Sequence, residues 1–161
     1  MHIHTDKLIV HKIKELKLDN FVLVSPDYGR SKWVARLAGQ LNAPHTAADK
    51  DRYAMDKTMV HQVASVVKDR PVIICDDMIR TGGSIIQTAL RCREAGARKT
   101  ILFATHLVMA GHSRQKFKEN GIDKIIGADT YPGVESDDLL DLFSVAPLVV
   151  TCLKRHLETA R

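Results

Sequence analysis

The chain has 161 residues, enough for one domain with its own core and too few for a second full domain. Apolar residues make up 45% of it and charged residues 27%, proportions that exclude a disordered, fibrous or repeat protein. The net charge of +5 suits phosphate-bearing ligands, RNA or anionic surfaces equally well. We therefore expect a single domain over residues 1–161 and cannot assign its ligand from charge alone.

The cysteines and the amino terminus indicate the compartment. Cys75, Cys92 and Cys152 are an odd number with no CxxC pair, so they predict reduced core thiols rather than a disulfide framework or a zinc ribbon. Residues 1–7 carry histidines and charges where a signal peptide needs an apolar region, and the longest apolar runs are shorter than the roughly 18 residues of a membrane span. We expect a soluble, cytoplasmic protein that does not enter a membrane.

Predicted helices and strands alternate along the chain. Helical spacing of apolar residues predicts five helices. The first ends before Asp19, the second covers residues 34–41, the third stops at Gly96, the fourth covers residues 113–120, and the last begins at about Pro147. Short apolar, β-branched runs predict strands over residues 21–24, 72–75, 100–107, 122–128 and 143–145, and the polar stretch 47–57 predicts a mobile loop. This alternation is typical of an α/β fold, a parallel β-sheet with helices on both faces.

In such a sheet ligands bind beyond the carboxyl ends of the strands, so the loops over residues 25–31, 76–84 and 105–111 are the candidate site. The second of these loops contains Thr81-Gly82-Gly83-Ser84 at the start of a predicted helix. Glycines let the backbone close on a ligand, and the unpaired N–H groups at a helix start favour an anion. With two hydroxyl donors added, this turn predicts a phosphate site.

Two acids, Asp76 and Asp77, precede that turn, directly after a buried strand. Ionised carboxylates accept hydrogen bonds from vicinal hydroxyls, as on a ribose, or hold a hydrated magnesium ion. Together with the phosphate turn they indicate ribose 5-phosphate. The alternative is that the acids only cap the helix, which would account for one acid but not for two beside a glycine pair.

The stretch Val72-Ile-Ile-Cys-Asp-Asp-Met-Ile-Arg-Thr-Gly-Gly-Ser84 resembles the fingerprint of the type I phosphoribosyltransferase fold, whose members bind or make phosphoribosyl pyrophosphate (PRPP). The chain over residues 6–158 is similar to the C-terminal half of the ribose-phosphate pyrophosphokinases, the PRPP synthetase family. Four further segments carry this resemblance: Val24-Ser-Pro-Asp-Tyr-Gly29, Asp49-Lys-Asp-Arg52, Ala104-Thr-His106 through Ala110-Gly111, and Asp129-Thr-Tyr-Pro132.

The resemblance implies roles for individual residues. Lys50 and Arg52 would be catalytic cations on the nucleotide phosphates, or else belong to an ordinary solvated loop. Asp27 would be a Mg²⁺ ligand, or only a turn residue, and His106 would contact the nucleotide or be a structural histidine. The ribose would be bound by Asp76 and Asp77, the 5-phosphate by Arg80, Thr81, Gly82, Gly83 and Ser84, and the pyrophosphate or nucleotide by Tyr28, Gly29, Arg30 and Lys32.

Two residues depart from the family pattern at the site itself. Arg80 stands where the synthetases have an aspartate beside the sugar, and Arg30 stands where they have the second glycine of the pyrophosphate loop. An arginine cannot accept a hydrogen bond from a ribose hydroxyl but strengthens phosphate binding. The sequence also has no counterpart of the family's N-terminal half, which recognises adenine, so a partner chain would supply that half. We also expect a homo-oligomer.

Three functional hypotheses follow. The first is Mg²⁺-dependent transfer of the diphosphoryl group of ATP to ribose 5-phosphate, the second is a phosphoribosyltransferase that consumes PRPP, and the third is a catalytically silent binding or regulatory subunit. The lysines of the first predicted helix are interpreted as a solvated face, which argues against a nucleic-acid partner.

Overall fold

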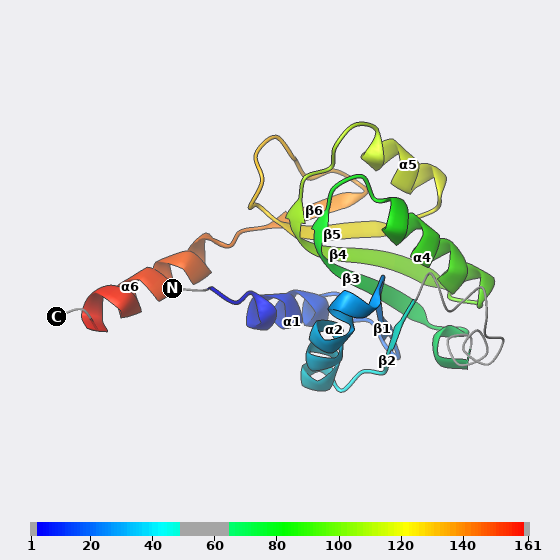
Figure 1. Ribbon diagram of the computed structural model, residues 1–161, viewed down its shortest axis with the longest axis horizontal. Helices are drawn as coiled ribbons and strands as arrows, with labels where there is room; N and C mark the ends of the chain where they lie inside the picture. Colours follow the sequence, from blue (N-terminus) through cyan, green and yellow to red (C-terminus); the bar gives the residue numbers. More distant parts are fainter. Residues whose placement is uncertain (1–2, 49–64, 160–161) are drawn as a thin grey trace.

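The computed structural model describes residues 3–48 and 65–159 (Figure 1). The described helices are α1 (Asp6–Glu15), α2 (Tyr28–Leu41), α4 (Gly83–Glu94), α5 (Ser113–Glu119) and α6 (Ala146–Thr159). The described strands are β1 (Val22–Ser25), β2 (His45–Ala47), β3 (Pro71–Ile79), β4 (Lys99–Leu107), β5 (Lys124–Ala128) and β6 (Leu140–Phe143). The strands form one sheet in the order β2-β1-β3-β4-β5-β6, and every neighbouring pair is parallel. The predicted α/β fold is confirmed.

Helices cover both faces of the sheet (Figure 1). α1 and α2 bury residues such as Ile13 and Leu37 against one face, and α4 and α5 bury residues such as Ala89 and Phe117 against the other. Strands β3 and β4 lie between two apolar layers, which explains their continuous apolar sequences. The two layers fix the central strands, whose carboxyl ends carry the candidate site.

Strand β3 is longer than the sequence predicts. It continues through Asp76 and Asp77 to Ile79, although these residues were expected in the connection to the next helix. The pairing with β4 persists there, with Asp76 opposite Ala104 and Ile79 opposite Leu107. Ladder hydrogen bonds with a buried neighbour outweigh the low strand preference of aspartate. The two acids are therefore held on a strand rather than on a loop.

The outer strands also differ from the prediction. The short edge strand β2 was not predicted, because its polar sequence carries no strand pattern, and it pairs only with β1. β6 ends at Phe143, where the predicted strand begins. Residues 49–57 of the predicted mobile loop lie outside the described residues.

The three cysteines are free, but only two belong to the core. Cys75 and Cys92 are buried, and burial raises the pKa of the Cys92 thiol to about 12 and that of Cys75 further still. The prediction of a core thiol is wrong for Cys152, which is half-buried on α6, a helix that extends away from the sheet (Figure 1). None of the described helices has the length and apolar character needed to cross a membrane.

Candidate functional site

The three loops named as the candidate site lie at neighbouring strand ends. β1, β3 and β4 are adjacent and parallel, so the segments that follow Ser25, Ile79 and Leu107 leave the sheet at the same edge. This proximity was predicted from the alternation of strands and helices.

The start of α4 forms the predicted phosphate cradle, which we define as residues 81–84. Gly82 is the N-cap of α4 with a φ of 78°, and no side chain caps the helix. The alternative that Asp76 and Asp77 cap this helix is therefore wrong. Thr81, Gly83 and Ser84 are exposed, so the helix start is open to an anion.

Gly82 is fixed in the cradle by packing as well as by backbone geometry. It is buried, and a Cβ added there would lie 2.2 Å from Cζ of Phe117, a fully buried residue of α5. No larger residue fits this position without moving Phe117. The sequence indicates the glycine but not its neighbour, which lies 35 positions further along the chain.

The backbone that leads into the cradle is bonded to the segment after β4. The N–H groups of Val108 and Met109 donate to the carbonyl of Ile79 at 2.9 and 3.1 Å, and the N–H of Ala110 donates to the carbonyl of Arg80 at 2.8 Å. The Arg80 residue itself is exposed. Its predicted phosphate contact stays a prediction.

Asp27 caps α2. Its Oδ1 accepts the backbone N–H of Arg30 at 3.0 Å, and its carbonyl accepts the hydroxyl of Ser25 at 2.6 Å. The turn role that the sequence left open is thus present in the structure. The role of Asp27 as a magnesium ligand stays a prediction.

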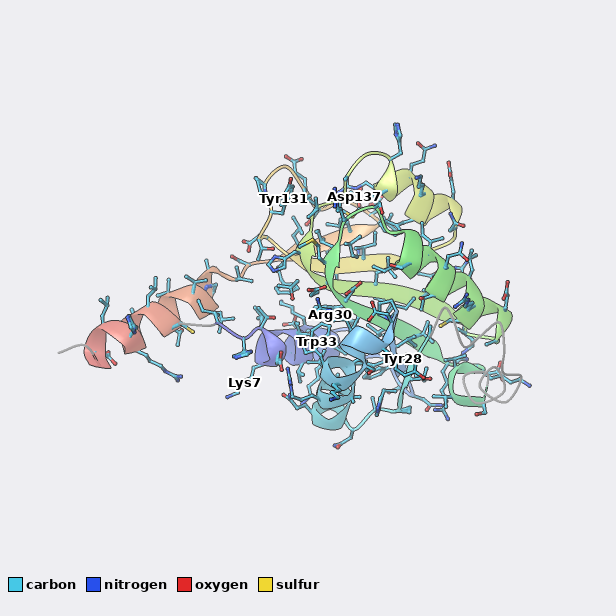
Figure 2. The ribbon with its side chains drawn as sticks, in the orientation of Figure 1. Lys7, Tyr28, Arg30, Trp33, Tyr131 and Asp137 are labelled. Carbon is cyan, nitrogen blue, oxygen red and sulfur yellow. The ribbon has the colours of Figure 1, made fainter. Side chains whose placement is uncertain are left out.

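Arg30 joins the first loop to the diacid, the pair Asp76 and Asp77. Its guanidinium Nη2 donates to Oδ2 of Asp77, and its Nε lies 3.8 Å from Oδ1 of Asp76. The backbone N–H of Asp77 donates to the same Asp76 oxygen at 2.8 Å. Figure 2 shows Arg30 between the start of α2 and the central strands. The structure therefore pairs a residue predicted to bind pyrophosphate with the acids predicted to bind ribose.

The described acids do not form an all-protein magnesium cage in this arrangement. Within residues 3–48 and 65–159 there is no group of three or more His, Cys, Asp or Glu side chains that could hold a metal ion. One oxygen of Asp27 is committed to the helix cap, and the guanidinium of Arg30 occupies the approach to the diacid. Mg²⁺ usually keeps several waters and binds through one or two carboxylates together with substrate phosphates, so a metal ion here would have to compete with the Arg30 guanidinium for the diacid.

His106 has a defined hydrogen-bonding state. Its Nδ1 lies 2.8 Å from the hydroxyl of Thr130, and that hydroxyl donates to the carbonyl of Thr105 at 3.0 Å. Because the hydroxyl proton is already used, Nδ1 carries a proton and donates, which leaves Nε2 of the neutral ring as an acceptor. His106 therefore has the structural hydrogen bond that the sequence left open as one of its two roles, and a ligand contact through Nε2 stays a prediction.

A cavity of about 480 Å³ adjoins the diacid. Asp77, Arg30 and His106 line it together with Trp33 and Arg36 of α2. The indole N–H of Trp33 donates to Oδ1 of Asp6 at 3.1 Å, and Nε of Arg36 donates to its Oδ2 at 2.8 Å. Neither Trp33 nor Arg36 was predicted as a site residue, although the spacing 30, 33, 36 places all three on one side of the helix.

The remaining predicted pyrophosphate and catalytic residues either lie away from the cavity or fall outside the described residues. Tyr28, Gly29 and Lys32 are exposed on the first turns of α2 and are not among the residues that line the cavity. Lys50 and Arg52, the predicted catalytic cations, lie outside the described residues. Their roles stay predictions.

Asp76 has a perturbed protonation equilibrium. Burial raises the pKa of its carboxyl from 3.8 to about 7, and the neighbouring Asp77 and Asp27 carboxylates act in the same direction. The folded protein thus holds this proton to a higher pH than the unfolded chain does. The stabilisation is complete below the unfolded pKa of 3.8 and is lost as the pH rises through about 7.

We expect the free energy of unfolding to fall between pH 4 and 7 by about 1–2 kcal/mol more in the wild type than in Asp76→Asn, because one pKa unit is about 1.4 kcal/mol and solvent screens part of the shift. Urea unfolding at several pH values measures it. Asp19→Asn, at an exposed acid remote from the site, is the control and should follow the wild type. Parallel pH profiles for wild type and Asp76→Asn would contradict the raised pKa.

The parallel sheet and the open helix start at its strand ends are typical of a phosphoribosyltransferase-type domain, and the comparisons agree. The chain belongs to the phosphoribosyl transferase domain family, whose model matches residues 1–135. It is 32% identical over 143 residues to the ribose-phosphate pyrophosphokinase of Helicobacter pylori (89% of this chain, 45% of that protein). It is 36% identical to that of Ureaplasma parvum (86% and 43%).

A solved structure supports the same relationship. The phosphoribosylpyrophosphate synthetase of Mycobacterium smegmatis matches with a TM-score of 0.82 and 31% identity, over 96% of this chain and 51% of that one. The predicted resemblance to the synthetases is confirmed. The chain spans about half the length of these relatives.

Proposed function

We propose that this chain is a synthetase-type phosphoribosyl domain that binds ribose 5-phosphate and takes part in diphosphoryl transfer from ATP to the 1-hydroxyl of that sugar. The observation that carries the proposal is the open start of α4, with Thr81 and Ser84 exposed, a few residues beyond the diacid on β3. The 5-phosphate would lie on the helix start, and the sugar hydroxyls would face the carboxylates.

In this reaction the 1-hydroxyl oxygen attacks the β-phosphorus of ATP, the bond from that phosphorus to the α-phosphate oxygen breaks, and AMP leaves. The protein's task is to position the two substrates and to offset charge on the moving group. Lys50 and Arg52 are the predicted cations for this task. Mg²⁺ belongs to the proposal as a companion of the ATP phosphates, with Asp27 as its predicted ligand in this chain.

His106 and Arg30 extend the proposed site beyond the sugar. His106 lines the same cavity as Asp77, and Nε2 of its neutral ring would accept a hydrogen bond from a ligand donor. The guanidinium of Arg30 would face the diphosphoryl group once a ligand separates it from the acids.

The greater length of the relatives suggests what this chain needs for the complete reaction. Ribose-phosphate pyrophosphokinases are about twice as long as the part that this chain matches. We propose that the complete reaction needs the remaining half from a partner chain or a further segment, within a homo-oligomer or a mixed assembly. The pairing of Arg30 with the diacid favours, as a second candidate, a subunit that binds sugar phosphate without turnover.

Isothermal calorimetry with ribose 5-phosphate, ATP and PRPP, each with and without Mg²⁺, tests the binding site. An assay of AMP release then separates the candidates. AMP release that depends on ribose 5-phosphate supports the synthetase, release of pyrophosphate from PRPP with an added base supports a transferase, and binding without either supports the silent subunit. If ribose 5-phosphate, PRPP and inorganic phosphate all fail to bind at millimolar concentration, the proposed function is wrong.

A further inference from the structure

Arg30 has more than one carboxylate around it. Arg36, Arg114 and Lys124 each pair with one aspartate. Arg30 contacts three: its guanidinium lies on Asp77 and beside Asp76, and its backbone N–H donates to Asp27. A single positive charge is thus placed among the acids from which a metal site at this edge would be built.

The position of this charge is built into the fold. The backbone of Arg30 is fixed in the first turn of α2 by the Asp27 cap, and the diacid is fixed on β3 by its pairing with β4. The side chain of Arg30 is 43% exposed and that of Asp76 only 14%. The guanidinium therefore lies on the solvent side of Asp76, whereas Asp77 is as exposed as Arg30 itself, at 43%. A divalent ion that used both acids would have to displace the guanidinium against the repulsion of like charges.

We propose that the guanidinium of Arg30 is the built-in counter-cation of the Asp76–Asp77 pair, in place of a divalent metal ion, so that this site takes a sugar phosphate without metal. The inference deepens the proposed function and rests on it for the identity of the sugar phosphate. Its metal-exclusion part concerns only this chain and does not depend on any substrate.

The first experiment measures Mn²⁺ binding to the full chain by electron paramagnetic resonance, with no sugar present. We expect Arg30→Gln and Arg30→Gly to bind Mn²⁺ about tenfold more tightly than the wild type, because an adjacent unit charge shifts carboxylate equilibria by about one unit or more. Adding Asp77→Asn to Arg30→Gln should remove the gained site. Arg114→Ala, which removes an arginine of similar exposure from a distant aspartate, should match the wild type.

Wild type and Arg30→Gln binding Mn²⁺ equally would overturn the proposal, as would a gained site that survives Asp77→Asn. Arg30→Gln keeps a helix-forming residue in α2, and thermal melts verify that each variant is folded.

The second experiment titrates ribose 5-phosphate by calorimetry in EDTA and in Mg²⁺. The wild-type Kd should agree within about twofold between the two conditions, whereas Arg30→Gln should bind weakly in EDTA and recover in Mg²⁺. A wild type that binds only with Mg²⁺ contradicts the inference. If no variant binds the sugar phosphate at all, the proposed function fails, and the Mn²⁺ titration still decides the role of Arg30.

Discussion

Gly82→Ala is expected to destabilise the protein by about 3 kcal/mol. A residue with a Cβ loses about 1 kcal/mol in the left-handed backbone conformation, and the overpacked contact in the core adds about 2 kcal/mol. The φ of Gly82 is 78°, and the added methyl group would lie 2.2 Å from Cζ of Phe117. Phe117 is fully buried, so it cannot move aside freely. Any accommodation shifts the start of α4, and we expect ribose 5-phosphate binding to be lost with it.

Urea unfolding and calorimetry measure the two effects. Gly83→Ala is the matched control for stability, because Gly83 is the next residue, begins the helix, and has nothing within 4 Å of an added Cβ. It should leave the free energy of unfolding unchanged or raise it slightly. Combining Gly82→Ala with Phe117→Leu should recover part of the overpacking loss. Equal stability of the two alanine variants would contradict the packing described for the cradle.

Replacing Thr81 and Ser84 together by alanine is expected to weaken ribose 5-phosphate binding about thirtyfold, because two neutral hydrogen bonds contribute about 1 kcal/mol each. Both residues are exposed at the open start of α4, so stability should change little. Calorimetry with ribose 5-phosphate measures the loss. Ribose without its phosphate is the control ligand, and its affinity should not change; an unchanged affinity for ribose 5-phosphate would place the phosphate elsewhere.

The elements with a continuous pattern were predictable from the sequence. The strand expected over 100–107 is observed as Lys99–Leu107, and the helix expected to stop at Gly96 ends at Glu94 with Gly96 at a positive φ of 92°. The edge strand His45–Ala47 was not predictable, because its residues are polar and carry no strand pattern. It is held in the sheet by pairing with β1 alone. The continuation of β3 through two aspartates depends on its partner β4, which local sequence does not show.

The candidate site also has parts that were predictable from the sequence and parts that were not. The cradle, the diacid and the loop after β1 come from local motifs, and each lies at the predicted edge of the sheet. The pairing of Arg30 with Asp77 joins residues 47 positions apart, and the contact of Phe117 with Gly82 joins two helices. Neither has a sequence signal of its own, because both arise only when the layers pack.

The hydrogen bonds from residues 108–110 to Ile79 and Arg80 link the segment after β4 to the segment between β3 and α4. A phosphate that orders the start of α4 also restrains the segment that leads into α5, which itself carries none of the predicted phosphate contacts. We therefore expect the amide protons of Val108 and Ala110 to exchange more slowly with solvent when the cradle is occupied. We also expect substitutions in that segment to weaken ligand binding by loosening the backbone behind the cradle, without removing any group that touches the ligand.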